Sequence, residues 1–211
     1  LENTIVARLT AGGEIEPIGS RFCSFSGHAR GPALAFNAAG ELFVAEACPN
    51  GPRRITGIAG AAAATFTENV QGPSGLAFGP GGDLYVSEGP PGNLVRVSPD
   101  GARHPIASGL NQPQGLAFGP QGLLHVAELG GNRVSQVDGH GTITSFVTVT
   151  APIDLAFAGA DLLVSTETGA LWRAAPDGTT ALFAQGPGNA AGIALASDGS
   201  VVAAFGADNS I

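Results

Sequence analysis

Residues 112–128 read QPQGLAFGPQGLLHVAE, which is two short apolar runs joined by a link that contains Gly and Pro. Short runs separated by such a link predict the two strands of a β-hairpin. Four other stretches repeat the pattern, two of them closely and two more weakly. They are 30–46 (RGPALAFNAAGELFVAE), 72–88 (GPSGLAFGPGGDLYVSE), 151–167 (APIDLAFAGADLLVSTE) and 189–205 (NAAGIALASDGSVVAAF). The chain is therefore built from one repeated hairpin.

The repeat has a period of about 40 residues. Phe36, Phe78, Phe118, Phe157 and Leu195 hold the same place in the five copies and follow one another at intervals of 42, 40, 39 and 38 residues. Between the copies lie further pairs of short runs, such as 93–98 and 103–108, which flank the turn sequence Pro99-Asp100-Gly101. Strand-rich repeats of this length are the signature of β-propeller blades. We therefore predict an all-β propeller whose blades are four-stranded antiparallel meanders. The strands of each blade are lettered a to d from the centre outward.

The repeats predict a single domain, 1–211, with five blades. The expected blades are 32–69, 73–108, 113–148, 152–184, and 190–211 together with 4–19. Because the chain begins with a c–d pair and ends with an a–b pair, the two ends would share one blade and close the ring. In that arrangement Ile211 lies near 4–6 and strand b of the last blade pairs with the strand that starts at Thr4. The alternatives are a fragment of a longer array and a half-open ring that closes by oligomerising; we expect a monomer.

The composition limits the classes of partner. Thirty-three Gly, fifteen Pro and 12% charged residues are typical of many tight turns between short strands. A net charge of −8 argues against binding a phosphate backbone, which needs clustered basic residues. No apolar run has the length of a membrane span, so membrane insertion is not expected.

The motifs P-x-G-L-A-F, G-x-L-Y-V-A/S-E and G-N-x-V resemble those of NHL-repeat propellers and of the related streptogramin-lyase-like and gluconolactonase/regucalcin-like propellers. The resemblance covers nearly the whole chain. It implies a binding scaffold, a lactonase or a lyase. In regucalcin-like relatives an Asp and an Asn near the channel mouth hold a catalytic calcium, so calcium is the cofactor that the resemblance implies. In this chain the matching slots hold Pro32, Ser74, Gln114, Ile153 and Ala191, and of these we take Gln114 as a ligand-binding candidate.

Four glutamates close strand b in successive blades. They are Glu46, Glu88, Glu128 and Glu167, and Phe205 holds that place in the last blade. On the propeller face formed by the d–a and b–c loops, they could bind calcium or attract a cationic ligand. The alternative is structural: each Glu accepts hydrogen bonds from the backbone of its own b–c turn, such as Gly92-Asn93 or Gly131-Asn132.

Asp154 is a charge where the other copies hold small residues, namely Ala33, Gly75, Gly115 and Gly192. A lone carboxylate in a constricted position is a candidate general base, and with Glu128 a candidate metal ligand. The alternative is that Asp154 caps the turn after Pro152.

An insertion at 20–31 (SRFCSFSGHARG) is expected over the same face. Its residues Phe25, His28 and Arg30 are binding candidates, because aromatic and Arg side chains are common in binding surfaces; alternatively, the segment packs its own two Phe. Cys23 lies in this insertion, and Cys48 lies in the next loop on the same face. We predict a disulfide between them, which implies an oxidising compartment and a secreted, periplasmic or extracellular protein; two free thiols are the alternative.

The sequence favours a secreted propeller that serves as a binding or scaffold module for a protein, a peptide or a small polar ligand. The alternatives are a metal-assisted lactonase or lyase that uses Asp154, and an engineered or excised fragment without a native activity.

Overall fold

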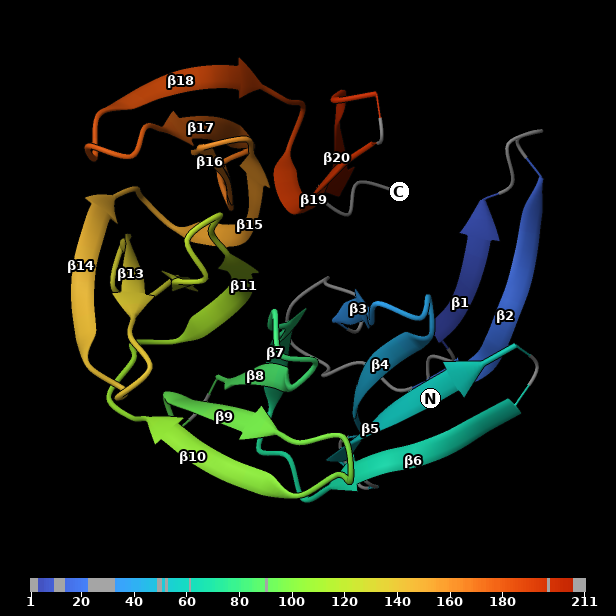
Figure 1. Ribbon diagram of the computed structural model, residues 1–211. Helices are drawn as coiled ribbons and strands as arrows, with labels where there is room; N and C mark the ends of the chain where they lie inside the picture. The colour runs from blue at the N-terminus through green and yellow to red at the C-terminus, as the bar shows by residue number, and fades with distance from the viewer. Residues whose placement is uncertain are drawn as a thin grey trace.

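The computed structural model describes residues 4–9, 14–22, 33–48, 51, 53–60, 62–89, 91–196 and 198–206. Within these ranges every regular element is a β-strand (Figure 1). None of the described residues belongs to a helix that is long and apolar enough to span a membrane.

Sixteen of the described strands form four four-stranded antiparallel sheets, each in simple chain order. The first contains β3 (Leu34–Phe36), β4 (Leu42–Ala47), β5 (Arg53–Ala59) and β6 (Ala62–Glu68); the second, β7 (Pro73–Phe78), β8 (Leu84–Glu88), β9 (Asn93–Val97) and β10 (Arg103–Ala107); the third, β11 (Pro113–Phe118), β12 (Leu124–Glu128), β13 (Arg133–Val137) and β14 (Ile143–Thr148); the fourth, β15 (Pro152–Ala158), β16 (Asp161–Thr166), β17 (Ala170–Ala174) and β18 (Thr180–Gln185). The sheets surround a common centre with their first strands innermost (Figure 1). The prediction of four-stranded antiparallel meanders is confirmed for these four sheets.

Neighbouring sheets pack through a repeated aromatic contact. The ring of Phe43 on β4 lies 4.9 Å from that of Phe78 on β7, and Tyr85 on β8 lies at the same distance from Phe118 on β11. The anchor residue of one innermost strand thus packs on the second strand of the preceding sheet. Such edge-to-face contacts add to the burial of the aliphatic side chains between the sheets.

The turn between the third and fourth strands of a sheet rests on the preceding sheet. Gly141 has φ 83°, and a Cβ on it would lie 2.0 Å from the carbonyl oxygen of Ile106. Glycine adopts this conformation without strain and lets the two backbones approach. The turn glycines therefore serve packing between sheets as well as chain reversal.

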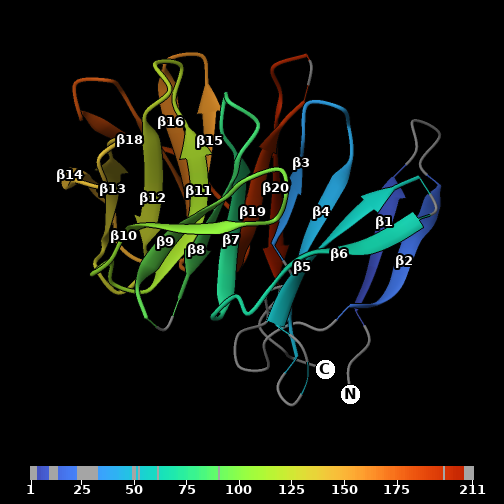
Figure 2. The same cartoon turned by 60° about the horizontal axis from the view of Figure 1, so that its bottom comes forward.

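The two ends of the chain form separate two-stranded sheets. One joins β1 (Thr4–Leu9) to β2 (Ile15–Phe22), and the other joins β19 (Asn189–Leu195) to β20 (Val201–Gly206). Among the described residues, β20 is hydrogen-bonded only to β19, and β1 only to β2. The expected pairing of β20 with β1 is therefore not formed, and the two hairpins stand apart in Figures 1 and 2. Ile211 lies outside the described residues.

The predicted insertion begins later than expected. β2 continues to Phe22, so residues 20–22 are paired in a strand with Ser20 opposite Ile5 and Phe22 opposite Thr4. The backbone keeps its ladder hydrogen bonds there, which the sequence pattern alone did not indicate.

Candidate functional site

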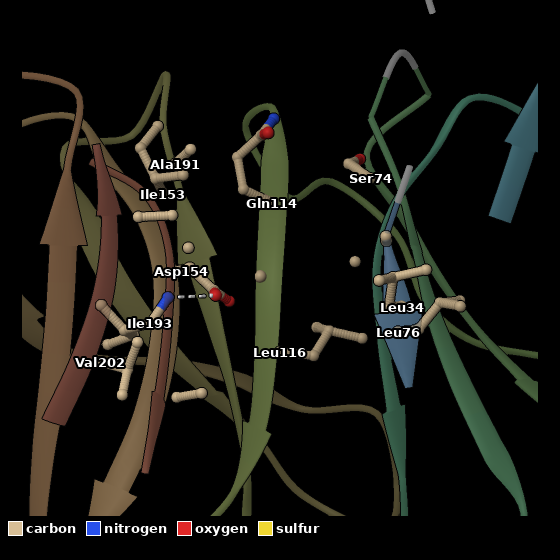
Figure 3. A pocket seen from close by; sticks show the side chains of 16 residues that line it. Leu34, Ser74, Leu76, Gln114, Leu116, Ile153, Asp154, Ala191, Ile193 and Val202 are labelled. Atoms are coloured by element: carbon tan, nitrogen blue, oxygen red, sulfur yellow. Dashed lines mark hydrogen bonds between the residues drawn. The ribbon is translucent and has the colours of Figure 1, made fainter. Parts of the chain in front are cut away.

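The innermost strands enclose a pocket of about 530 Å³ (Figure 3). Residues from β3, β7, β11, β15, β19 and β20 line it. Its walls are mainly aliphatic or small, with Leu76, Leu116 and Ile193 among them. Among the described residues of this lining, Asp154 is the only charged one, and Ser74 and Gln114 are the other polar ones. The structure thus brings two of the predicted site residues, Asp154 and Gln114, into one cavity on adjacent innermost strands.

Asp154 lies on β15 opposite Ser165 and is held by backbone groups. Its Oδ1 accepts a hydrogen bond from the N–H of Leu155 at 2.9 Å, and its Oδ2 accepts one from the N–H of Ile193 on β19 at 3.0 Å (Figure 3). Asp154 therefore links two innermost strands, whereas the sequence alternative made it the cap of the turn after Pro152. That alternative is wrong because the carboxylate bonds across to β19.

Glycines on both neighbouring strands make room for this carboxylate. A Cβ on Gly115 of β11 would lie 2.3 Å from Oδ1 of Asp154, and one on Gly192 of β19 would lie 3.5 Å from Oδ2. The small residues that mark Asp154 out in the sequence are thus its physical surroundings. A side chain at position 115 would fill the place of the carboxylate.

Burial raises the pKa of Asp154 to about 6, because the charged form loses solvation between the strands. The hydrogen bonds from Ile193 and Leu155 lower the pKa and oppose this shift only in part. Part of the residue is still exposed. At pH 7 the carboxylate is mostly ionised, with a pKa suited to taking up and releasing a proton.

Gln114 and Ser74 lie on the two strands that precede β15 around the centre. The carbonyl oxygen of Gln114 accepts a hydrogen bond from the hydroxyl of Ser87 at 2.6 Å, and the hydroxyl of Ser74 donates to the carbonyl oxygen of Pro113 at 2.9 Å. These bonds fix β7, β8 and β11 to one another and so fix the pocket wall that carries both side chains.

Glu46, Glu88 and Glu128 are buried in ion pairs and do not line the pocket. Glu46 accepts hydrogen bonds from Arg54 and Thr56, and Glu88 from Arg103 and the N–H of Gln71. Glu128 accepts them from Arg133, from Ser135 and from the N–H of Asn111 at 2.6 Å.

Burial by itself raises the pKa of Glu128. The hydrogen bonds from Arg133, Asn111 and Ser135, with the charge of Arg133, outweigh that effect and lower the pKa. Such a carboxylate stays ionised and belongs to the framework of its sheet.

The glutamates differ from the expected structural arrangement in two ways. The donors are arginines, hydroxyls and the N–H groups of residues 71 and 111, rather than the b–c turn N–H groups that we expected. In the fourth sheet the buried position is held by Thr166, which pairs with Pro152 as Glu128 pairs with Pro113. Glu167 follows it and is only half-buried. One fewer residue in that repeat shifts the register, and the sequence pattern concealed this.

Within the described residues, no three His, Cys, Asp or Glu side chains gather so that they could hold a metal ion. Glu128, the second metal candidate, lies in its ion pair away from the pocket lining. Cys48 is not a free thiol. Its predicted partner Cys23, and the candidates Phe25, His28 and Arg30, lie outside the described residues, so the disulfide and the loop site stay predictions.

No family model matches the chain, and no curated protein does. Solved structures do match. A gluconolactonase from Xanthomonas campestris has a TM-score of 0.78 at 20% identity, over 96% of this chain and 76% of that one. Virginiamycin B lyase from Staphylococcus aureus has a TM-score of 0.68 at 21% identity, over 89% and 66%. The PQQ-bound aldose sugar dehydrogenase from Streptomyces coelicolor has a TM-score of 0.74 at 18% identity, over 90% and 78%.

The chain is a β-propeller. Its fold is of the type found in the streptogramin B lyase and gluconolactonase structures, which confirms the fold resemblance. The chain spans 66% of the length of the staphylococcal lyase. Sequence identities near 20% support a shared fold and no more than that. Membership of the NHL repeats stays a prediction.

The arginines that pair with the glutamates were not predicted from the sequence. Arg54 and Arg133 lie on third strands, whereas Arg103 lies on a fourth strand, so they do not recur at one place in the repeat. These pairs could have been anticipated in general terms, because a buried carboxylate needs a cation or several hydrogen-bond donors.

Proposed function

We propose that the propeller binds a small molecule in its central pocket, with Asp154 as the polar anchor. The observation that carries this proposal is that, among the described residues, one charged side chain lies in a mainly aliphatic and small-residue pocket of about 530 Å³, with Gln114 and Ser74 as its other polar groups. Ligand pockets typically combine such walls with a few polar groups that set the orientation of the ligand. An ionised carboxylate has about four lone-pair sites, and the backbone N–H groups of Leu155 and Ile193 occupy two of them.

The ligand class follows from these walls and this charge. A ligand with an apolar body and one amine or other hydrogen-bond donor would place the donor on Asp154 and the body against Leu76, Leu116 and Ile193. The net charge of −8 also favours a cation over an anion.

Two matched probes test this proposal, cyclohexylamine and cyclohexanecarboxylate. We expect the amine to perturb the NMR signals of Ile193 and Leu155 and the carboxylate to leave them unchanged. Asp154→Asn should weaken amine binding by about tenfold or more, since it removes a charge-assisted hydrogen bond. Asp177→Asn, an exposed turn substitution, is the control. Equal binding of both probes, or no loss in Asp154→Asn, would contradict the proposal.

A second candidate is a lactonase or lyase in which Asp154 is the general base. Its pKa of about 6 supports this candidate, as does the similarity to a gluconolactonase and a streptogramin B lyase. In lactone hydrolysis the carboxylate would take a proton from water while the water oxygen bonds to the carbonyl carbon. The ring C–O bond would then break, and the proton would pass to the departing alkoxide.

The described residues do not fit the calcium that the resemblance implies. Calcium takes six to eight oxygen ligands, with carboxylates prominent among them, and the described lining offers the side-chain oxygens of one carboxylate, one amide and one hydroxyl. We therefore propose that Asp154 acts as the base without a bound metal ion.

Hydrolysis of glucono-1,5-lactone tests the second candidate. We expect a rate that rises with pH through about 6 and falls at least a hundredfold in Asp154→Asn. Calorimetric titration with calcium should give no heat that depends on Asp154. Activity that survives the substitution would remove Asp154 from the chemistry. Secretion and a scaffold role for the loop face remain proposals that rest on the predicted Cys23–Cys48 disulfide and the 20–31 segment.

A further inference from the structure

The exposed large hydrophobic residues of the propeller are not scattered. Phe36 on β3 is 62% exposed, whereas its repeat partners Phe78, Phe118 and Phe157 pack on a ring from the preceding sheet. The residue that should meet Phe36 belongs to β20, because β19–β20 forms the sheet before β3 around the centre (Figure 1). That interface is open.

Val202 is the matching residue on β20. It pairs with Ala194, as Tyr85 pairs with Ala77 and His125 with Ala117. Tyr85 and His125 each contact the anchor Phe of the next sheet, yet Val202 is 59% exposed. Both sides of the open interface thus present the apolar residue that a closed interface buries.

Phe183 on β18 shows which element is missing. It lies at a register shift of the outermost strand, the place that Phe66, Ile106 and Phe146 hold in the other sheets. Those three pack into the cores between sheets, and the c–d turn of the next sheet covers the backbone of Phe66 and Ile106 through Gly101 and Gly141. Phe183 is 49% exposed, because the sheet that follows it, β19–β20, has no c–d pair.

The β1–β2 hairpin has the backbone register of a c–d pair. Leu9 pairs with Ile15 as Val97 pairs with Arg103, and a register shift leaves Ile18 unpaired where the other sheets have their bulge residue. β1 and β20 each have one edge without a ladder in the described residues. Free strand edges favour addition of another strand.

We propose that the β1–β2 hairpin of a second copy of this chain docks on β20 and Phe183, so that two copies complete each other's fifth blade. A second copy offers the missing c–d pair in the right register, and the exchange is reciprocal and closed, which gives a two-fold dimer. Within one copy the two hairpins stand apart (Figure 2). Docking of the hairpin does not require a ligand in the pocket. It also bears on the pocket, since Leu34 and Val202 line the pocket wall at the open interface.

Light scattering with size-exclusion chromatography tests the stoichiometry. We expect about 42 kDa, twice the 20.9 kDa of the chain, at about 100 µM and a shift toward 20.9 kDa on dilution. Val202→Lys should raise the dimer dissociation constant at least tenfold, because it places a charge on β20, the strand on which the hairpin of the second copy would dock. Thr144→Lys, exposed on β14 on the opposite side of the ring, should leave the constant unchanged.

Engineered cysteines distinguish exchange from closure within one chain. By analogy with Val86 and Val95, Ala203 should lie opposite Ala7 of the docked hairpin. A mixture of differently tagged Ala203→Cys and Ala7→Cys proteins should give a crosslinked heterodimer. A monomer at every concentration would overturn the proposal, as would a double variant that crosslinks only within its own chain.

Discussion

Glu128 and Asp161 are both carboxylates paired with an arginine, but only Glu128 is fully removed from water. Glu128→Ala leaves Arg133, Ser135 and the N–H of Asn111 without their acceptor, and we expect a loss of about 2–4 kcal/mol in the free energy of unfolding. Asp161→Ala, which breaks the exposed pair with Arg173, should cost no more than about 1 kcal/mol. Urea unfolding at pH 7 measures both values, and equal losses would show that burial does not decide the contribution.

The Glu128 contribution should also depend on pH. Its folded pKa is lowered below the unfolded value of 4.5, so its stabilisation is present above pH 4.5 and is lost as the pH falls toward the folded pKa. The difference between wild type and Glu128→Ala should therefore shrink in acid.

Asp154 should show the opposite pH dependence. Its folded pKa of about 6 lies above the unfolded value of 3.8, so its favourable contribution is present below pH 3.8 and is lost as the pH rises through 6. Relative to wild type, Asp154→Asn should become more stable between pH 4 and pH 7. Asp177→Asn is a control that should change little between these pH values, because hydrogen bonds from Thr179 lower the pKa of Asp177 below 3.8 and its effect, of opposite sign, falls mainly in more acidic solution. Urea unfolding at the two pH values measures both, and a constant difference for Asp154→Asn would mean that the carboxylate is better solvated than its surroundings indicate.

At the scale of elements, the innermost strands approach one another because they carry small residues beside Asp154. In Gly115→Ala, the new Cβ would lie 2.7 Å from the Cα of Asp154 and 2.9 Å from the carbonyl oxygen of Ile153. Backbone atoms cannot turn aside as a side chain does, so β11 and β15 must separate, at a cost of about 1–3 kcal/mol. Gly139→Ala, in a turn with no heavy atom within 4 Å of the new Cβ, should have almost no effect. Thermal unfolding compares the two, and equal midpoints would argue against tight packing at the centre.

At the scale of the molecule, the described residues of the propeller form four four-stranded sheets and two two-stranded ones. Central strands such as β8, β12 and β16 have hydrogen-bonded neighbours on both sides and buried side chains, whereas β20 has one neighbour and alternating exposure. In dilute solution, amide hydrogen exchange should be fastest in β20 and slowest in those central strands. Protection of β20 equal to that of β12 at the lowest concentration would indicate a blade completed within one chain.

The repeats could be predicted because their causes are local. Alternating apolar residues specify a half-buried strand, and Gly at the turns permits the positive φ that a tight reversal requires; Gly101 and Gly141 both have φ 83°. Asp154 could be recognised as a site candidate because it breaks the small-residue pattern at one position. Gln114, the other candidate that lines the pocket, could also be recognised from its place in the repeat.

What the sequence by itself determined is the class of fold, the meander form of the blades and the single unusual charge near the centre, because each can be recognised within one repeat or by comparing the repeats. Only the tertiary structure decided which groups donate hydrogen bonds to the buried glutamates and that Thr166, rather than Glu167, holds the buried position. It also decided that Phe36 and Val202 are left exposed at an open interface. The partners of the glutamates lie between 5 and 17 positions away on other strands or loops, and Phe36 and Val202 lie in the first and last repeats, so the repeat pattern does not specify these contacts. The physical reason is that a hydrophobic pattern specifies which side of a strand seeks burial, but the element that covers that side is chosen by packing in three dimensions.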